Sequence, residues 1–254
     1  MSEWATALAE VPVPGPVPRY EIPGWRERFG VVAGITGRGA NPGTGFDLGL
    51  STREPVGDVM DLWREFRCAE PGFDAFVMGY QVHGSVIAEH EGAQGWTLLD
   101  GVDGHVTRER GTLLLVSAAD CIPIYLVAPK GRVIALLHAG WRGTGDGILS
   151  RGIERLASLG ASSAADIVMH CGVGICGTCY EVGREVMDAC GVAAPGSGPW
   201  HLDLRARLAA EARRLGLAQV TTSSWCSAHD RRAFFSHRAS GGADGRMVAY
   251  LGLL

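Results

Sequence analysis

The chain has 254 residues, of which 46% are hydrophobic and 20% charged, so it carries ample sequence for a globular core and does not have the composition of a disordered protein. A formal net charge of −4, without clustered lysine and arginine, argues against general nucleic-acid binding. The acidic N-terminus lacks the pattern of a secretory signal and no apolar run is long enough to span a bilayer, so we expect neither a nucleic-acid nor a membrane partner.

The expected secondary structure alternates irregularly between strands and helices. A strand over residues 31–35 is followed by a helix in which Val59, Leu62, Trp63 and Phe66 share one face. The remaining expected elements are, in chain order, strands at 75–82, 112–116, 122–127 and 133–137, a helix near 147–157, a strand at 167–171, a helix at 181–189, a helix through Leu204 and Leu215 capped by Asp203, and a strand at 246–254. Adjacent strands around residue 121 favour a mixed sheet over a uniformly parallel one.

Seven cysteines are present, an odd number, and they lie in apolar or glycine-rich runs. This usage is unlike the disulfide framework of a small secreted domain. It indicates a reducing, cytoplasmic setting, in which a thiolate stays available as a metal ligand.

Three residues in short runs of unusual composition are candidate ligands: His83, Cys121 and His138. Each is expected at the end of a strand, where ligands from distant segments meet at one edge. Two imidazoles and one thiolate suit zinc and leave a fourth position open, which is typical of a catalytic rather than a structural site. Their separations match no local zinc-finger spacing, however, and each residue alone is more often an ordinary core or surface residue. From the residues alone, both interpretations stay open.

Five motifs resemble, in order, the YfiH-type family, also called laccase-domain or polyphenol-oxidase-like. They are Gln-Val-His-Gly (81–84), Ala-Asp-Cys-Ile-Pro (119–123), His-Ala-Gly-Trp-Arg-Gly-Thr (138–144), Cys-Tyr-Glu-Val-Gly (179–183) and Phe-Phe-Ser-His-Arg (234–238). The resemblance covers residues 23–254. It implies a single α+β domain with a layered α/β/β/α arrangement of mixed β-sheets over residues 25–254. Residues 1–24 are assigned to a proline-rich N-terminal extension, and the proline pattern of 11–24 predicts that this part runs extended over the surface.

The resemblance also implies an activity. Members include purine nucleoside phosphorylases, which convert adenosine, inosine or methylthioadenosine and phosphate to the free base and ribose 1-phosphate, with adenosine deamination alongside. Their zinc is bound by two histidines and a cysteine that map onto His83, Cys121 and His138, and copper binding in vitro is compatible with the same ligands. The sequence departs from the family pattern at Asp47, Trp63, His105 and His237. The oligomeric state stays open between a monomer and a small homo-oligomer.

Three further residues are candidate substrate-binding groups. Arg142 lies in a glycine-rich turn that opens a helix, where free backbone N–H groups favour an anion such as phosphate. Arg38 matches a family position near the site, although a surface ion pair explains it equally well. Asp103, like Asp120, is a candidate either for the site or for an acceptor that orients a histidine, and turn capping explains both carboxylates equally well. Trp141 is a candidate for stacking on a purine ring or for packing beneath the helix.

Several alternative functions are weighed against this one. A copper-binding polyphenol oxidase is the first, but no histidine forms the His-x-His pairs of multicopper oxidases. A zinc deaminase of the cytidine-deaminase type would need a His-x-Glu and Pro-Cys-x-x-Cys signature, which is absent. A Cys-His hydrolase or amidase acting on a cell-wall precursor would use Cys121 as nucleophile and His138 as base. A non-enzymatic binding module would leave the ligand set without a role.

Two further motifs are judged not to be functional. The glycines of residues 172–177 resemble a dinucleotide fingerprint but lack the acidic residue about 20 positions later. Cys176 and Cys179 have the spacing of a redox or zinc pair, but we find no second pair with the right spacing, and Cys171 and Cys190 could complete a four-sulfur site only by coincidence of the fold. Cys226 is interpreted as structural.

Overall fold

Two seven-stranded mixed sheets form the framework of the part of the chain that the computed structural model describes, residues 5–40, 45–50, 54–161 and 163–254. Sheet A has the order β1 (Thr6–Leu8), β15 (Gln219–Ser223), β12 (Val168–Cys171), β10 (Ile122–Ala128), β11 (Val133–Ala139), β8 (Gly104–Thr107) and β6 (Ile87–His90). Sheet B has the order β2 (Val11–Val13), β3 (Arg19–Glu21), β4 (Val31–Thr36), β16 (Met247–Leu253), β9 (Thr112–Ala118), β5 (Ala75–Tyr80) and β7 (Gly95–Asp100). The expected mixture of parallel and antiparallel pairing is confirmed.

The two sheets pack face to face, and the alternation of side chains along their central strands shows why. In β10, Tyr125 and Val127 belong to the cluster between the sheets, while Ile124 and Leu126 belong to a second cluster on the outer face of sheet A. A strand whose two faces are both buried reads as a continuous apolar run, and β10 and β11 are buried at every position. Tyr125 also crosses the interface, because its hydroxyl donates to the carbonyl of Gly34 at 2.7 Å.

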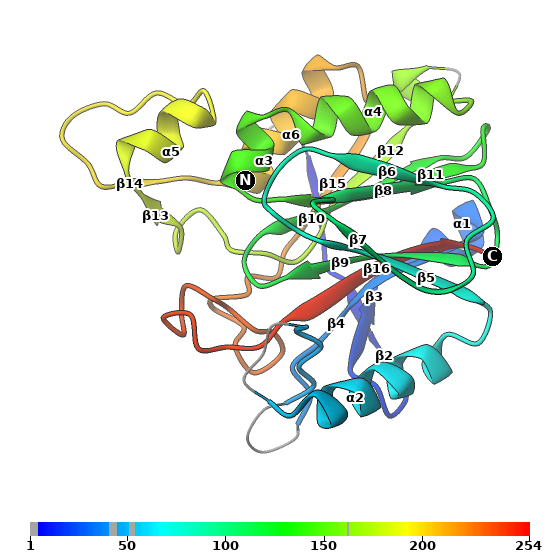
Figure 1. Ribbon diagram of the computed structural model, residues 1–254. Coiled ribbons are helices and arrows are strands. Elements are labelled where there is room, and N and C mark those ends of the chain that lie inside the picture. The colour runs from blue at the N-terminus through cyan, green and yellow to red at the C-terminus, as the bar shows by residue number, and fades with distance from the viewer. Residues whose placement is uncertain (1–4, 41–44, 51–53, 162) are drawn as a thin grey trace.

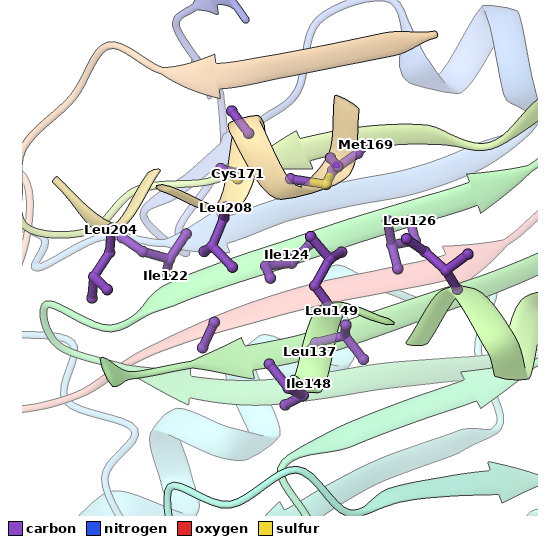
Figure 2. Packing of buried hydrophobic residues seen from close by; sticks show 14 of the residues in the cluster. Ile122, Ile124, Leu126, Leu137, Ile148, Leu149, Met169, Cys171, Leu204 and Leu208 are labelled. Atoms are coloured by element: carbon purple, nitrogen blue, oxygen red, sulfur yellow. The ribbon is translucent and has the colours of Figure 1, made fainter. Parts of the chain in front are cut away.

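Helices cover the outer faces of both sheets (Figure 1). On sheet A lie α3 (Trp141–Gly145), α4 (Ile148–Ser158), α5 (Arg184–Ala189) and α6 (Leu204–Arg214), and on sheet B lies α2 (Val56–Ala69). Figure 2 shows apolar side chains of α4 and α6 meeting those of the central strands. Short elements complete the chain: α1 (Trp25–Phe29), the 3-10 helix η1 (Ala164–Asp166) and a two-stranded ribbon of β13 (Glu181–Val182) and β14 (Trp200–His201). The expected α+β class and its α/β/β/α layers are confirmed.

Two expected elements are shorter than the apolar pattern suggested. The strand expected at 75–82 ends at Tyr80, since the next residues turn away to carry His83. The helix expected from residue 181 begins at Arg184, because Glu181 and Val182 pair with β14 and Gly183 is the N-cap. The expected cap of α6 is confirmed, with Asp203 accepting from the backbone N–H of Ala206 at 2.9 Å.

The proline-rich N-terminal segment is extended, and it adds edge strands to both sheets. Its β1 pairs with β15 in sheet A, whereas β2 and β3 extend sheet B beyond β4. Pro12 lies in β2, at an edge where its missing N–H costs no ladder hydrogen bond. No helix among the described residues has the length and apolar character needed to cross a membrane.

Glu10 anchors this segment in the core. Its carboxylate accepts from Ser223 Oγ at 2.6 Å and lies 3.1 Å from His170 Nε2, and its carbonyl accepts from Trp225 Nε1 at 3.0 Å. The glutamate itself is 1% exposed. A buried carboxylate with this many partners fixes the position of β1 and β2 on the two sheets.

Replacing Glu10 by alanine is expected to lower the free energy of unfolding by about 3 kcal/mol, because His170 and Ser223 would be left buried without their partner. Urea denaturation of the variant against the wild type measures this. Glu27→Ala, on the exposed surface of α1, is the matched control and should leave stability within about 0.5 kcal/mol. Equal midpoints for the two variants would contradict the anchoring role.

Candidate metal centre

His83, Cys121 and His138 meet where the two sheets come together. His83 follows β5 of sheet B, Cys121 lies in the connection from β9 of sheet B to β10 of sheet A, and His138 is near the end of β11. The register of β10 and β11 pairs Pro123 with His138, which brings the preceding turn beside that histidine. One ligand atom from each of the three residues lies within 4.8 Å of the other two. The structure therefore brings together the three side chains that the sequence singled out.

The loop that carries His83 is held in a strained shape by two polar side chains. Gln81 donates to the carbonyl of Ser117 at 2.9 Å and accepts from its N–H at 2.7 Å, which fixes the loop to β9. His83 has φ 61°, in the left-handed region that non-glycine residues rarely adopt. The carboxylate of Asp103 accepts from the successive N–H groups of Val82, His83 and Gly84 at 3.1, 2.9 and 2.8 Å. Such strain is maintained when surrounding contacts over-determine the conformation, as is common at functional sites.

Asp103 also orients His138. Its Oδ1 lies 2.9 Å from His138 Nδ1, which leaves Nε2 as the ring nitrogen available to the site. Burial opposes the charged carboxylate, but hydrogen bonds from His138 and the backbone N–H groups outweigh it and lower the pKa of Asp103. Asp103 is fully buried and does not line the cleft described below. Its position thus fits an orienting role and not direct contact with a substrate.

The thiol of Cys121 is tuned by the two histidines. Burial disfavours its thiolate, but the charge of His138 and hydrogen bonds from His138 and His83 outweigh burial and lower the pKa of Cys121 to about 6. Burial likewise disfavours the charged imidazole, yet the thiolate and the hydrogen bond to Asp103 raise the pKa of His138 to about 9. The metal-free site therefore favours a thiolate, which is the form that binds metals and acts as a nucleophile.

Asp120, next to Cys121, does not orient a histidine. Its Oδ1 accepts from Ser227 Oγ at 2.6 Å and from Ser236 Oγ at 2.7 Å, and its Oδ2 accepts from the N–H of Arg238 at 2.6 Å. Asp120 has φ 87°, so a second left-handed, non-glycine residue adjoins the site. These bonds fasten two distant loops to the turn that presents the thiol.

Two glycines of the His-Ala-Gly-Trp-Arg-Gly run allow the close approach of these segments. A Cβ at Gly140 would lie 3.1 Å from both Cys121 Sγ and His83 Cδ2. A Cβ at Gly143 would lie 2.6 Å from the carbonyl oxygen of Gly84. Side chains at either position would push apart the segments that carry the candidate ligands.

The variant Gly140→Ala is expected to lower the affinity for zinc about tenfold, because the added methyl group displaces Cys121 and His83 from their common centre. Competition with a chromogenic zinc chelator measures this affinity. Gly183→Ala is the control, since its Cβ would meet nothing within 4 Å and its φ of −82° suits alanine. Equal zinc affinity of both variants would show that Gly140 does not have this spacing role.

The three side chains face a cleft of about 800 Å³. Arg142 and Trp141 line it, and the Arg142 guanidinium lies 4.4 Å above the Trp141 ring. Arg142 is exposed, and no hydrogen bond or ion pair of its side chain is present within the described residues. Its guanidinium is therefore free to bind an anion. Trp141 packs against the core beneath α3, as one of its two expected roles requires, and it also lines the cleft, so stacking on a purine stays a prediction.

Arg38 lines the same cleft but has a protein partner. Its Nη2 lies 2.6 Å from Asp244 Oδ2, and its guanidinium lies 4.3 Å from the Phe235 ring. Two other residues of the cleft, Arg238 and Tyr180, were not predicted from the sequence. The guanidinium of Arg238 stacks on the ring of Tyr180, 5.1 Å from its centroid. Both lie within sequence motifs shared with the family (179–183 and 234–238), and these motifs were the signal that could have identified them.

The four departures from the family pattern fall in different places. Asp47 and His237 line the cleft, and Asp47 accepts from the N–H groups of Gly49 and Arg246 at 2.8 and 2.7 Å. Trp63 and His105 are buried outside it. Burial, with the neighbouring His90, lowers the pKa of His105 to about 3. Only the first two can act directly on a bound ligand.

Comparison with known proteins identifies the family. The sequence model of the family described as multi-copper polyphenol oxidoreductase laccase matches residues 29–254. The chain belongs to this family. The expected YfiH-type, laccase-domain membership is therefore confirmed.

Relatives in this family have been given enzymatic names. The purine nucleoside phosphorylase YlmD of Geobacillus stearothermophilus is 34% identical over 253 residues, which cover 88% of this chain and 90% of the relative. The adenosine deaminase RL5 of an unknown prokaryotic organism is 34% identical over 247 residues, covering 85% and 92%. The crystal structure of the Geobacillus protein superposes with a TM-score of 0.86 at 28% identity, over 96% of this chain and 99% of that one. The expected enzymatic role is confirmed.

Proposed function

We propose that the protein is a zinc-dependent purine nucleoside phosphorylase. It would convert adenosine, inosine or methylthioadenosine and phosphate to the free base and ribose 1-phosphate, with adenosine deamination as a side activity. The observation that carries this proposal is the set of His83, Cys121 and His138 facing a cleft lined by arginine and aromatic side chains. Relatives named purine nucleoside phosphorylase and adenosine deaminase support the choice of substrate.

The donor set fits zinc. Two imidazoles and one thiolate suit this ion, and three protein ligands leave one position for a small molecule. The hydrogen bond from His138 to Asp103 fixes the tautomer that a metal-binding histidine needs. When bound, zinc would act as a Lewis acid on an oxygen of phosphate or water. Copper could be held by the same ligands in vitro.

The side chains of the cleft can position both substrates. In phosphorolysis a phosphate oxygen forms a bond to C1′ of the ribose while the bond from C1′ to the purine nitrogen breaks, and the base leaves with the electron pair. Arg142, whose guanidinium has no ion pair within the described residues, would bind and orient the phosphate. Trp141 and Tyr180 provide flat apolar surface against which a purine can lie.

A Cys-His hydrolase is the second candidate function, and the pKa values of Cys121 and His138 are the specific observation that favours it. A Cys121 thiol with a pKa of about 6 beside a His138 imidazole with a pKa of about 9 resembles an activated nucleophile and its base. Above about pH 6, iodoacetamide should alkylate Cys121 in metal-stripped protein under either hypothesis. Zinc at stoichiometric concentration should block this alkylation if the site holds metal, whereas a hydrolase would stay reactive and active without zinc.

The deciding experiment combines elemental analysis of purified protein with detection of purine products. We expect adenine and ribose 1-phosphate from adenosine in the presence of phosphate, and inosine or hypoxanthine from the deaminating reaction. Removing phosphate should stop base release and leave deamination. Removing zinc should stop both, and turnover by metal-free protein would refute the proposal.

We also propose a cytoplasmic location, with purine nucleoside and phosphate as small-molecule partners and neither nucleic acid nor membrane among them. All seven cysteines are unpaired, which fits the reducing compartment inferred from their usage.

A further inference from the structure

A second group of potential metal ligands lies outside the cleft. Within the described residues it consists of Cys176, Cys179, Cys226 and His229, and none of the four lines the cleft. The expectation that Cys176 and Cys179 have no second pair is therefore wrong, and Cys171 and Cys190 do not join the group. The missed signal is Cys226-x-x-His229, a second pair with the same spacing as the first.

The separations within this group suit one small ion. One ligand atom from each of the four residues lies within 4.8 Å of the others. His229 places its Nδ1 3.7 Å from Cys176 Sγ and its Nε2 3.1 Å from Cys179 Sγ. Tetrahedral zinc, with bonds of about 2.3 Å to sulfur and about 2.0 Å to nitrogen, separates its ligand atoms by about 3.5 to 3.8 Å. One nitrogen of His229 would serve as the ligand, and the separations within the group are close to those around a single tetrahedral ion.

Each pair of ligands is presented by a tight turn. In the first turn, the N–H groups of Cys179 and Tyr180 donate to the carbonyl of Cys176 at 3.0 and 3.1 Å. In the second, the N–H of Asp230 donates to the carbonyl of Cys226 at 2.8 Å, and Asp230 Oδ2 accepts from the N–H of Cys226 at 2.9 Å. In both turns, backbone hydrogen bonds fix the positions from which the ligand side chains extend.

The two turns are also joined to each other by backbone contacts. Gly174 and Cys226 form a parallel β-bridge, and the N–H of Ser227 donates to the carbonyl of Gly174 at 3.1 Å. The N–H of Cys176 donates to Cys226 Sγ at 3.3 Å. This contact places the sulfur of Cys226 directly beside the first turn.

We propose that Cys176, Cys179, Cys226 and His229 form a second, structural zinc site. Three thiolates and one imidazole at two Cys-x-x-Cys/His spacings form the closed tetrahedral set of structural zinc centres. All four ligands come from the protein, so the site has no open position for a substrate. It is distinct from the three-ligand group in the cleft, which has one.

A disulfide explains the group less well. It would use two of the three cysteines and would give the third cysteine and His229 no role. All of these cysteines are unpaired in the structure. A single ion accounts for all four side chains and for the convergence of two segments that lie 50 residues apart in the sequence.

The site would fasten the wall of the cleft. Ile175 directly precedes Cys176, and Tyr180 directly follows Cys179. The side chains of Ile175 and Tyr180 both line the cleft. On the other segment, Ser227 adjoins Cys226 and donates to Asp120 at 2.6 Å, beside Cys121. A metal that clamps the two segments would therefore hold the wall of the cleft and the turn of the catalytic thiol in a fixed relation.

Zinc content per chain tests the proposal, measured on full-length protein purified in zinc-containing buffer without chelator. With both centres filled, the wild type should hold two zinc ions. His83→Ala should retain one and Cys179→Ser should retain one, whereas Cys68→Ser, at an exposed cysteine outside both groups, should retain two. Cys179→Ser should also have a lower Tm than Cys68→Ser, because it loses the clamp.

Cobalt substitution adds a readout that does not depend on the folding of the cysteine variant. His83→Ala protein loaded with cobalt(II) should keep a strong thiolate-to-cobalt absorption, since the second site supplies three sulfurs and the first only one. If the wild type held only one zinc ion, and if His83→Ala kept this ion while Cys179→Ser lost it, the second site would be supported and the site in the cleft refuted. Two results would overturn the proposal. One is His83→Ala protein that is purified without bound zinc and shows no such absorption after loading with cobalt(II). The other is a Cys176–Cys179 disulfide in anaerobically purified wild type.

Discussion

Cys121→Ser is expected to reduce phosphorolysis of adenosine at least about 100-fold and to remove the zinc of the cleft, since several kcal/mol of transition-state stabilisation by the metal would be lost. Serine keeps the size of the side chain but stays protonated near neutral pH, so the ligand group would lose its one anionic member. The hydrogen bonds that position the turn come from Asp120 and not from the thiol, so the variant should fold. Zinc analysis and product formation, measured on one preparation, check both effects.

Two controls separate this effect from general damage. Cys190→Ser replaces a buried cysteine whose Sγ donates to the carbonyl of Trp141 at 3.6 Å and should keep its zinc and most of its activity. His83→Ala should reproduce the loss seen for Cys121→Ser, because His83 belongs to the same ligand group. Normal turnover by folded, zinc-depleted Cys121→Ser protein would refute the metal mechanism.

The core of the fold could be predicted because its signal is local. The central strands β10 and β11 are buried on both faces and read as continuous apolar runs. The helix α2 keeps Val59, Trp63 and Phe66 on one buried face, as its spacing indicated. For strands such as β7, which alternates between half-buried and exposed positions, the apolar pattern is weak and pairing is set by neighbours distant in the sequence.

The layers could not be derived from periodicity and came only from the family resemblance. The consecutive strands β9 and β10 belong to different sheets, and the three residues between them include Cys121. Nothing local in Ala119-Asp120-Cys121 states that the chain changes sheets there. The chain can pass from one sheet to the other here because Asp120 has a left-handed φ and is held by hydrogen bonds to Ser227, Ser236 and Arg238. All three partners lie more than 100 residues away in the sequence.

The candidate ligands could be selected from their motifs, but their environment could not. Asp103 illustrates the difference. From the sequence it was a candidate either for the site or for an orienting acceptor, and only the folded geometry shows its carboxylate behind His138 and beneath the loop of His83. The same limit applies to Cys226 and His229, whose spacing was visible in the sequence while their proximity to Cys176 was not.

Arg142→Ala is expected to raise the KM for phosphate by about tenfold to 100-fold and to change the KM for nucleoside much less. Charged hydrogen bonds of about 1.5 to 3 kcal/mol would be lost at the phosphate, and Arg142 is the cleft arginine whose side chain forms no hydrogen bond or ion pair within the described residues. Initial rates with phosphate and adenosine varied independently measure this split.

The deaminating reaction supplies an internal comparison for the same variant, because it consumes water and not phosphate. Deamination by Arg142→Ala should therefore stay near the wild-type rate while phosphorolysis falls. Arg151→Ala, an exposed arginine of α4 outside the cleft, should leave both reactions unchanged. If Arg142→Ala lowered both reactions equally, its role would lie in the packing of Trp141 beneath the guanidinium, and the phosphate would have to bind elsewhere in the cleft.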